Sequence, residues 1–264
     1  MSSIHKEHIV RAVVAGTRAS READLVVSLF TPAGRMSAYA YGAKKSRTRF
    51  LGALDLFATI DAELCPQRKS AFGMPTLRSA VVRTARLGLR DDLGKIALGA
   101  YVVELVTTVG PEGTGAGELF ELLTRTLDQL VHAPASSVLR RTFELRLLLA
   151  MGCQPELSGC VVCGSDQAQG RWFLDLERGG LLCSRHREDA KEVGPHTLAW
   201  MRGALRMDAS ETSMDHRPPL THNVDDDIAS RAAHHAGSYI DAFFSGHIDR
   251  PLRSKSMLVD CGLA

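Results

Sequence analysis

Residues 23–41 read Ala-Asp-Leu-Val-Val-Ser-Leu-Phe-Thr-Pro-Ala-Gly-Arg-Met-Ser-Ala-Tyr-Ala-Tyr, and their pattern indicates the architecture of the first domain. Leu25, Val27 and Leu29 alternate with their neighbours, which is the period of a strand with one buried face. Thr31-Pro-Ala-Gly34 is typical of a hairpin turn, because proline presets φ and glycine closes the bend. The stretch therefore predicts two antiparallel strands.

Further strand-like segments lie on both sides of this hairpin. Ile9-Val-Arg-Ala-Val-Val14 precedes it, and residues 56–64 and 76–82 follow it, after a helix or turn near 50–55. Five short strands in roughly 80 residues predict a small closed β-barrel of the oligonucleotide-binding (OB) type over residues 1–83.

The charges of the chain are unevenly divided. Residues 1–90 hold 15 Lys and Arg against 6 Asp and Glu, and residues 91–264 hold 17 against 24, so the net charge of +2 conceals a basic first third. Four cations and a tyrosine gather in this part: Tyr41, Lys44, Lys45, Arg47 and Arg49. We expect them to contact the phosphates and bases of a nucleic acid. A solvated basic surface and a barrel-filling tyrosine are the alternatives.

Beyond Asp92 the hydrophobic period becomes helical. Apolar stripes from Leu93 to Ala100 and from Leu119 to Leu130, separated by a loop over 110–117, predict two helices, and the largely apolar segment 138–151 predicts a third. Two more helices are predicted over residues 195–205 and 228–244. The middle and end of the chain are therefore mainly helical.

Two short pairs of metal-ligating residues interrupt the helical part. Cys160-Val-Val-Cys163 and Cys183-Ser-Arg-His186 fall within one window of 27 residues. Each short loop can point two ligands at one tetrahedral ion, so the spacing predicts a closed zinc site with one Zn²⁺ per chain. Four protein ligands leave no open position, which favours a structural metal over a catalytic one.

The fourth zinc ligand has two candidates. Cys153 lies seven residues before Cys160, across a Gln154-Pro155 break that could fold it back toward the metal. A thiolate suits zinc at least as well as the imidazole of His186 does. The sequence leaves both open.

The composition limits the remaining possibilities. No apolar run approaches the length of a membrane span, and the N-terminus carries no apolar signal segment. We expect a cytoplasmic protein, not bound to membrane, in which Cys65 and Cys261 are reduced. No phosphate-binding loop or catalytic triad is suggested, so neither an enzyme nor a small-molecule substrate is expected.

These observations predict a multidomain α+β protein. The expected parts are an OB-fold barrel over 1–83, a helical domain beginning over 91–152, a zinc-binding ribbon over 153–190, and the rest of the helical domain over 191–264.

This order of parts resembles the bacterial recombination mediator family RecO, over nearly the whole chain. The matching segments are Phe30-Thr-Pro-Ala-Gly-Arg35, Tyr41-Gly-Ala-Lys-Lys-Ser-Arg47, Leu145-Arg-Leu-Leu-Leu-Ala-Met-Gly152, Cys160-Val-Val-Cys-Gly164, Gly179-Gly-Leu-Leu-Cys183 and Arg250-Pro-Leu-Arg-Ser-Lys-Ser256. The chain departs from the family pattern where His186 replaces the usual fourth cysteine and where Cys153 stands at a position that is usually not cysteine.

The resemblance implies a non-enzymatic, nucleoid-associated DNA repair factor. Such a factor binds single- and double-stranded DNA, anneals complementary strands, and works with RecR to help RecA replace single-strand-binding protein. In the helical domain, the guanidinium groups of Arg140 and Arg141 are candidates to receive the acidic tail of single-strand-binding protein. Solvated helix faces are the alternative there. An OB-fold and zinc-ribbon protein that binds RNA in translation or transcription is the competing function.

Overall fold

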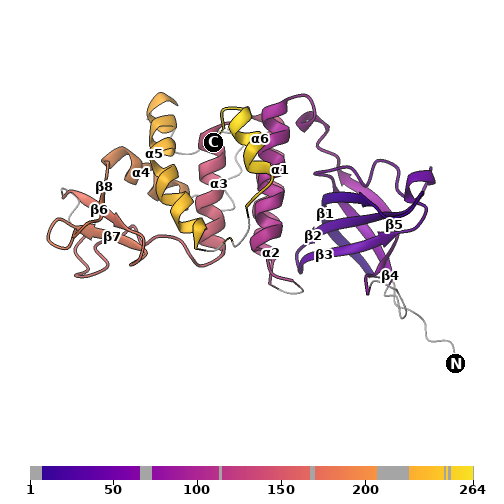
Figure 1. Ribbon diagram of the computed structural model, residues 1–264, viewed down its shortest axis with the longest axis horizontal. Coiled ribbons are helices and arrows are strands. Elements are labelled where there is room, and N and C mark those ends of the chain that lie inside the picture. The colour runs from indigo at the N-terminus through magenta and orange to yellow at the C-terminus, as the bar shows by residue number, and fades with distance from the viewer. Residues whose placement is uncertain are drawn as a thin grey trace. The chain divides into compact units, whose positions relative to one another are not determined.

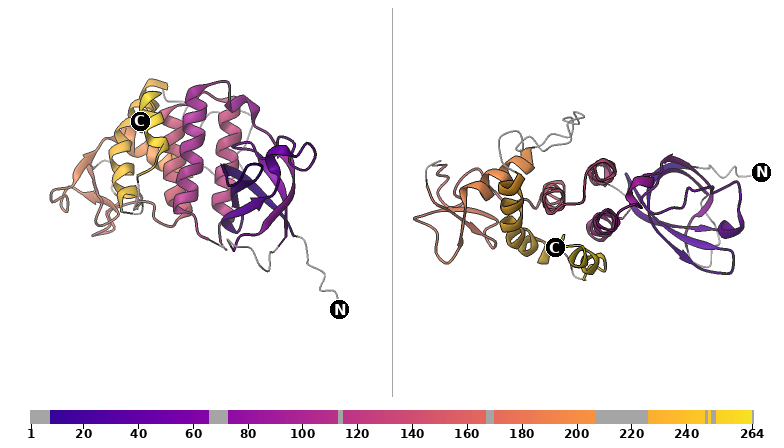
Figure 2. Two further views of the ribbon diagram at one scale, coloured as in Figure 1. Left: turned by 45° about the vertical axis from the view of Figure 1, so that its right-hand side comes forward. Right: turned by 90° about the horizontal axis from the view of Figure 1, so that it is seen from above.

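The computed structural model describes residues 8–65, 73–112, 115–166, 170–206, 226–246, 248 and 251–263. By packing, the chain forms two compact units. The first comprises Met1–Pro134 with Leu252–Cys261, and the second comprises Ala135–Pro251 with Gly262–Ala264. The ribbon is drawn in Figures 1 and 2.

The first unit contains the expected barrel. Its strands are β1 (His8–Ala19), β2 (Leu25–Thr31), β3 (Gly34–Ala40), β4 (Thr59–Cys65) and β5 (Thr76–Thr84). They close in the order β1-β2-β3-β5-β4, and β4 pairs with β1. Neighbours are antiparallel except β3 and β5, which meet in parallel at Tyr39 and Thr76. Figure 1 shows the strands wrapped around one another, and the OB-type prediction is confirmed.

The interior of the barrel is filled by the alternating residues that predicted it. Val27, Leu29, Ile60 and Leu77 are almost completely buried in one hydrophobic cluster. The β2–β3 turn closes as expected around Thr31, whose hydroxyl donates to the Gly34 carbonyl at 2.9 Å. The strand pattern of the sequence thus sets the register of this hairpin.

Helices complete the first unit. They are α1 (Leu93–Val109), α2 (Gly117–His132) and the short α6 (Ser254–Asp260), with single 3₁₀ turns η1 (Ala43–Lys45) and η2 (Leu87–Leu89). Asp92 caps α1 by accepting the backbone N–H of Lys95 at 2.8 Å. The helix α6 packs on α1, where Glu104 accepts the backbone N–H groups of Arg253 and Ser254.

Two contacts fix these helices to the barrel. The buried guanidinium of Arg86 donates to the Phe57 carbonyl and the Thr59 hydroxyl on the barrel side, and to Asp128 on α2. At the end of α1, a Cβ on Gly110 would lie 2.7 Å from the ring of Phe30, so only glycine allows this close approach. The barrel and its helices therefore pack as one unit.

In its described residues, the second unit combines three helices and a small sheet. The helices are α3 (Ser137–Ala150), α4 (Pro195–Arg206) and α5 (Asp226–Ser245), and the strands are β6 (Trp172–Asp175), β7 (Gly180–Cys183) and β8 (Lys191–Val193). Ser136 caps α3 through the backbone N–H of Leu139. The sheet has the order β7-β6-β8 and forms the expected ribbon. Packing thus groups the helices differently from the predicted domain boundaries, which remain a prediction.

Candidate metal centre and nucleic-acid interface

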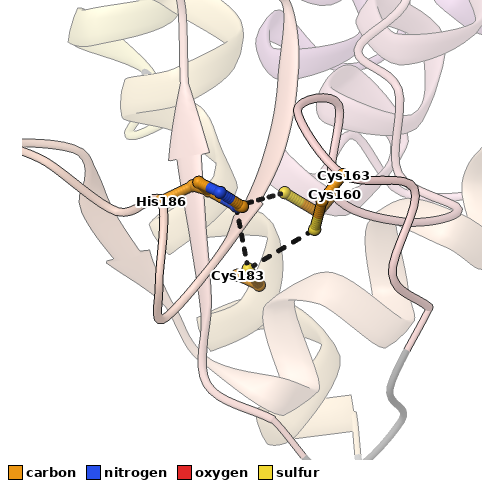
Figure 3. Close-up of side chains that lie close together, drawn as sticks. All are labelled: Cys160, Cys163, Cys183 and His186. Carbon is orange, nitrogen blue, oxygen red and sulfur yellow. Dashed lines mark hydrogen bonds between the residues drawn. The ribbon is translucent and has the colours of Figure 1, made fainter.

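Four side chains of the ribbon converge on one point. Cys160, Cys163, Cys183 and His186 place their ligand atoms within 4.8 Å of one another, and Figure 3 shows them turned toward each other. His186 Nδ1 lies 3.3 Å from the Cys183 sulfur and 3.6 Å from the Cys160 sulfur. The sulfurs of Cys163 and Cys183 are 3.9 Å apart.

These separations fit a tetrahedral ion. Zn–S bonds of about 2.3 Å and Zn–N bonds of about 2.0–2.1 Å give tetrahedral edges of about 3.5–3.8 Å. Three thiolates and one imidazole are also a donor set that zinc accepts in structural sites. The group could therefore hold a metal ion, and four protein ligands would fill its coordination sphere.

Local backbone geometry positions the ligands. The first pair lies on a tight loop in which the Gly164 N–H donates to the Cys160 carbonyl at 2.8 Å, and Gly164 has φ of +68°. The second pair follows β7, and the His186 N–H donates to the Cys183 carbonyl at 2.9 Å. The two loops are joined by the Val161 N–H, which donates to the Leu181 carbonyl on β7.

The electrostatics of the group favour a thiolate at its buried cysteine. Burial raises the pKa of Cys160, but backbone N–H groups of Cys183, Cys163 and Val162 and the ring of His186 lower it to about 6 overall. The same contacts with the two sulfurs raise the pKa of His186. A preformed thiolate is the form that binds a metal.

Cys153 lies outside this group. Its thiol contacts the Met151 carbonyl at 3.5 Å, and it is absent from the four-residue cluster that the described residues form. The backbone N–H of Cys153 donates to the Leu148 carbonyl and so continues the end of α3. Of the two candidates for the fourth position, the structure brings His186 and not Cys153 to the other three.

The basic loop, residues 44–49, is largely exposed and lies between β3 and β4 in the chain. It is anchored by its backbone: the Lys44 N–H donates to the Ala23 carbonyl at 3.0 Å, and the Arg49 carbonyl accepts from Ala80 on β5. Its four cations differ in their surroundings. Lys45 pairs with Glu22 at 3.0 Å, and Arg49 donates to the Tyr41 carbonyl at 2.7 Å while lying over the ring of Phe50.

The other two cations, Lys44 and Arg47, are exposed. Within the described part of the chain, their side chains have no hydrogen bond or salt bridge. They are therefore the members of the loop whose charge is available to an external anion.

Tyr41 lies next to this loop, and its ring contacts that of the buried Tyr39. Tyr41 is 43% exposed, and the centroids of the two rings are 4.5 Å apart. The Tyr39 hydroxyl donates to Asp24 at 2.9 Å, and the other oxygen of Asp24 accepts the Gly42 N–H at 2.8 Å. The Gly42 N–H and, more weakly, Tyr39 and Arg21 hold the pKa of Asp24 below its usual value against the effect of burial.

Asp24 was not predicted as part of this interface. One carboxylate orders both the aromatic pair and the start of the basic loop, although it lies 18 residues from Gly42 in the sequence. An aspartate just before a strand has many possible roles, so the sequence pattern gave no signal for this one. Its function is to position other residues.

The expectation for Arg140 and Arg141 is not supported. Arg140 is 1% exposed, Arg141 is 6% exposed, and both pair with the fully buried Glu144 on the same helix. Arg141 also binds Asp241 on α5, and Arg140 donates to the Leu263 carbonyl. Apolar neighbours in sequence indicated a groove, but the arginines lie inside the packed helices, so their guanidinium groups are not available to a peptide.

The fold and the Cys/His group define a class: multidomain α+β proteins built on an OB-type barrel, with helices and an inserted metal-binding ribbon. In the described residues, no helix combines the length and hydropathy needed to cross a bilayer. Two family models match the chain, Recombination protein O N terminal over residues 3–85 and Recombination protein O C terminal over residues 90–219. The chain belongs to the recombination protein O (RecO) family.

Curated relatives agree with this assignment. A DNA repair protein RecO of Pelobacter propionicus is 37% identical over 204 residues, which is 77% of this chain and 81% of the relative. The RecO of an Anaeromyxobacter species is 32% identical over 255 residues, covering 96% of this chain and 94% of the relative. That of Geobacter sulfurreducens is 31% identical over 248 residues, covering 94% and 95%.

Proposed function

We propose that this protein is a non-enzymatic recombination mediator in DNA repair, working in the cytoplasm at the nucleoid. It binds single- and double-stranded DNA, anneals complementary strands and, together with RecR, helps RecA to replace single-strand-binding protein. The observation that carries the proposal is membership of the RecO family over both parts of the chain. The exposed basic loop on an OB-type barrel supports the DNA-binding step.

In this proposal the metal-binding group has a structural role. Cys160, Cys163, Cys183 and His186 hold one Zn²⁺, which ties the loop at 160–164 to the end of β7. The bound ion contributes free energy of folding to the ribbon. DNA contacts are assigned to the barrel, with Tyr41 and the basic loop as the interface.

A strand-annealing assay with wild-type protein and the double variant Lys44→Gln/Arg47→Gln tests this function. Each phosphate contact contributes about 0.7 to the slope of log K against log salt on single strands, so the double variant flattens that slope by about 1.4 and slows annealing. The matched control is Arg83→Gln/Arg90→Gln, which removes two cations that are paired with Asp61 and Asp55. Circular dichroism verifies that both variants are folded.

Competition between DNA and RNA of the same sequence separates the two candidate functions. The repair role requires DNA to be bound at least as well as RNA, and annealing of complementary DNA strands by the wild type. A protein that binds RNA alone, or that fails to anneal DNA, contradicts the proposal. Co-purification with RecR, compared with ribosomes and RNA polymerase, tests the partner independently.

A further inference from the structure

The outer face of β1 carries an arginine that the basic cluster in the sequence does not include. Arg18 lies opposite Val26 on β2, and Val26 lies opposite Tyr39 on β3. Residues directly opposite one another in neighbouring strands share a face of the sheet. Val26 and Tyr39 are outside the cluster that fills the barrel, whereas the adjacent Val27 and Ala38 belong to it. Arg18 therefore lies on the same outer face as the tyrosine pair.

The β1–β2 turn, residues 20–24, is physically joined to the basic loop. Ala23 accepts the backbone N–H of Lys44 at 3.0 Å, and Asp24 accepts that of Gly42 at 2.8 Å. Glu22 pairs with Lys45 across the same junction. Strands are spaced by about 4.8 Å, so the backbone of Arg18 lies two spacings, about 10 Å, from that of Tyr39. The end of β1 and the loop thus flank the tyrosines from two sides.

Arg18 differs in its charge environment from Arg83 and Arg90, two other exposed arginines of the first unit. Arg83 pairs with Asp61, and Arg90 pairs with Asp55 at 2.8 Å. Arg18 is exposed, and among the described residues no acceptor or carboxylate contacts its guanidinium. Its charge is therefore available to an external phosphate, like those of Lys44 and Arg47.

We infer that Arg18, Tyr41 and the basic loop form one track for a single-stranded polynucleotide along the part of the barrel where the end of β1, the β1–β2 turn and the basic loop meet. The inference rests on the proposed function and extends it to a surface outside the basic loop. The partner is single-stranded because the ring of Tyr41, half exposed between cations, offers a stacking surface to an unpaired base. In a duplex the faces of the bases are covered by their neighbours.

The experiment is a salt titration of binding to a fluorescent oligo(dT) by the full chain and by Arg18→Gln. Loss of one phosphate contact flattens the slope of log K against log salt by about 0.7. The control Arg90→Gln removes the same formal charge from a cation that already has a carboxylate partner, and it leaves the slope unchanged. A folded Arg18→Gln protein whose slope equals that of the wild type overturns the inference.

Two further measurements make the outcome unambiguous. If Lys44→Gln/Arg47→Gln flattens the slope and Arg18→Gln does not, the track is wrong while the proposed function stands. If neither variant changes the slope, or the wild type does not bind DNA, the proposed function itself fails. An equal loss on a duplex of the same length would overturn the assignment to single strands.

Discussion

Glu22 neutralises one of the four cations of the basic loop through its salt bridge with Lys45. Both side chains are largely exposed, so the pair itself contributes little to stability. The salt bridge matters for the binding of DNA, because a phosphate that reaches Lys45 has to compete with the carboxylate of Glu22. Glu22→Gln should therefore tighten oligonucleotide binding and steepen the slope of log K against log salt by up to about 0.7.

The matched control for this change is Glu118→Gln, which removes the same charge from an exposed position in the first turn of α2. Both proteins are compared with the wild type in one oligonucleotide salt titration. An unchanged or weaker affinity in Glu22→Gln would show that Lys45 does not contact DNA.

The cations of the proposed interface are visible in the sequence, but their ion pairs are not. The cluster Lys44–Arg49 is visible in the sequence, whereas the pairing of Lys45 with Glu22 depends on a strand register that brings together residues 23 positions apart. For Arg18 the sequence shows an isolated cation. Only the strand pairing, which places Arg18 opposite Val26 and Val26 opposite Tyr39, shows which face of the barrel Arg18 occupies.

Among the described helices, α3 contains the most concentrated buried charge. Glu144 is completely buried and accepts from both Arg140 and Arg141. Glu144→Gln would leave two guanidinium groups in the interior with one partly exposed carboxylate, Asp241, and such a loss costs about 3–5 kcal/mol. We expect the free energy of unfolding, measured in urea, to fall by that amount.

Glu121→Gln provides the comparison on α2. Glu121 faces Arg125 on the surface at 3.8 Å, and removing an exposed pair of this kind costs less than about 1 kcal/mol. Equal losses in the two variants would mean that the network on α3 contributes no more than a surface pair does.

Helices and strands whose hydrophobic pattern repeats over many residues were predicted from the sequence, and very short ones were not. The predicted helices and barrel strands are all present, because each repeats its pattern over several residues. The strand β8, of three residues, and the helix α6, of seven, were not predicted. Both depend on distant partners: β8 pairs with β6, and Glu104 binds the start of α6 from about 150 positions away.

At the scale of the molecule, the metal-binding group and the proposed DNA interface belong to different units. Removing the metal with a chelator should therefore destabilise the ribbon and leave oligonucleotide affinity within about twofold of its starting value. Limited proteolysis should then cut first between residues 153 and 190, because the closed site contributes folding free energy there. Loss of DNA binding at the same chelator concentration would contradict this separation.

Two variants identify the ligands in the same experiment. Cys160→Ser should lose the ion and become sensitive to protease without chelator, whereas Cys153→Ser should keep one zinc per chain by elemental analysis. The sequence supplied the three cysteines and the histidine from spacing alone. The choice between Cys153 and His186 depended on the three-dimensional path of the chain after α3.

The position of α6 has a consequence for synthesis. The helix belongs to the first unit, but it is translated after nearly all of the second. At about 5–20 residues per second, a ribosome needs roughly 6 to 25 seconds to go from the end of α2 to the start of α6. During that interval α1 lacks the helix α6 that packs on it. Leu258 of α6, which is fully buried in the finished protein, has not yet been made. The barrel can form early, but its unit reaches its final packing only when the last helix emerges.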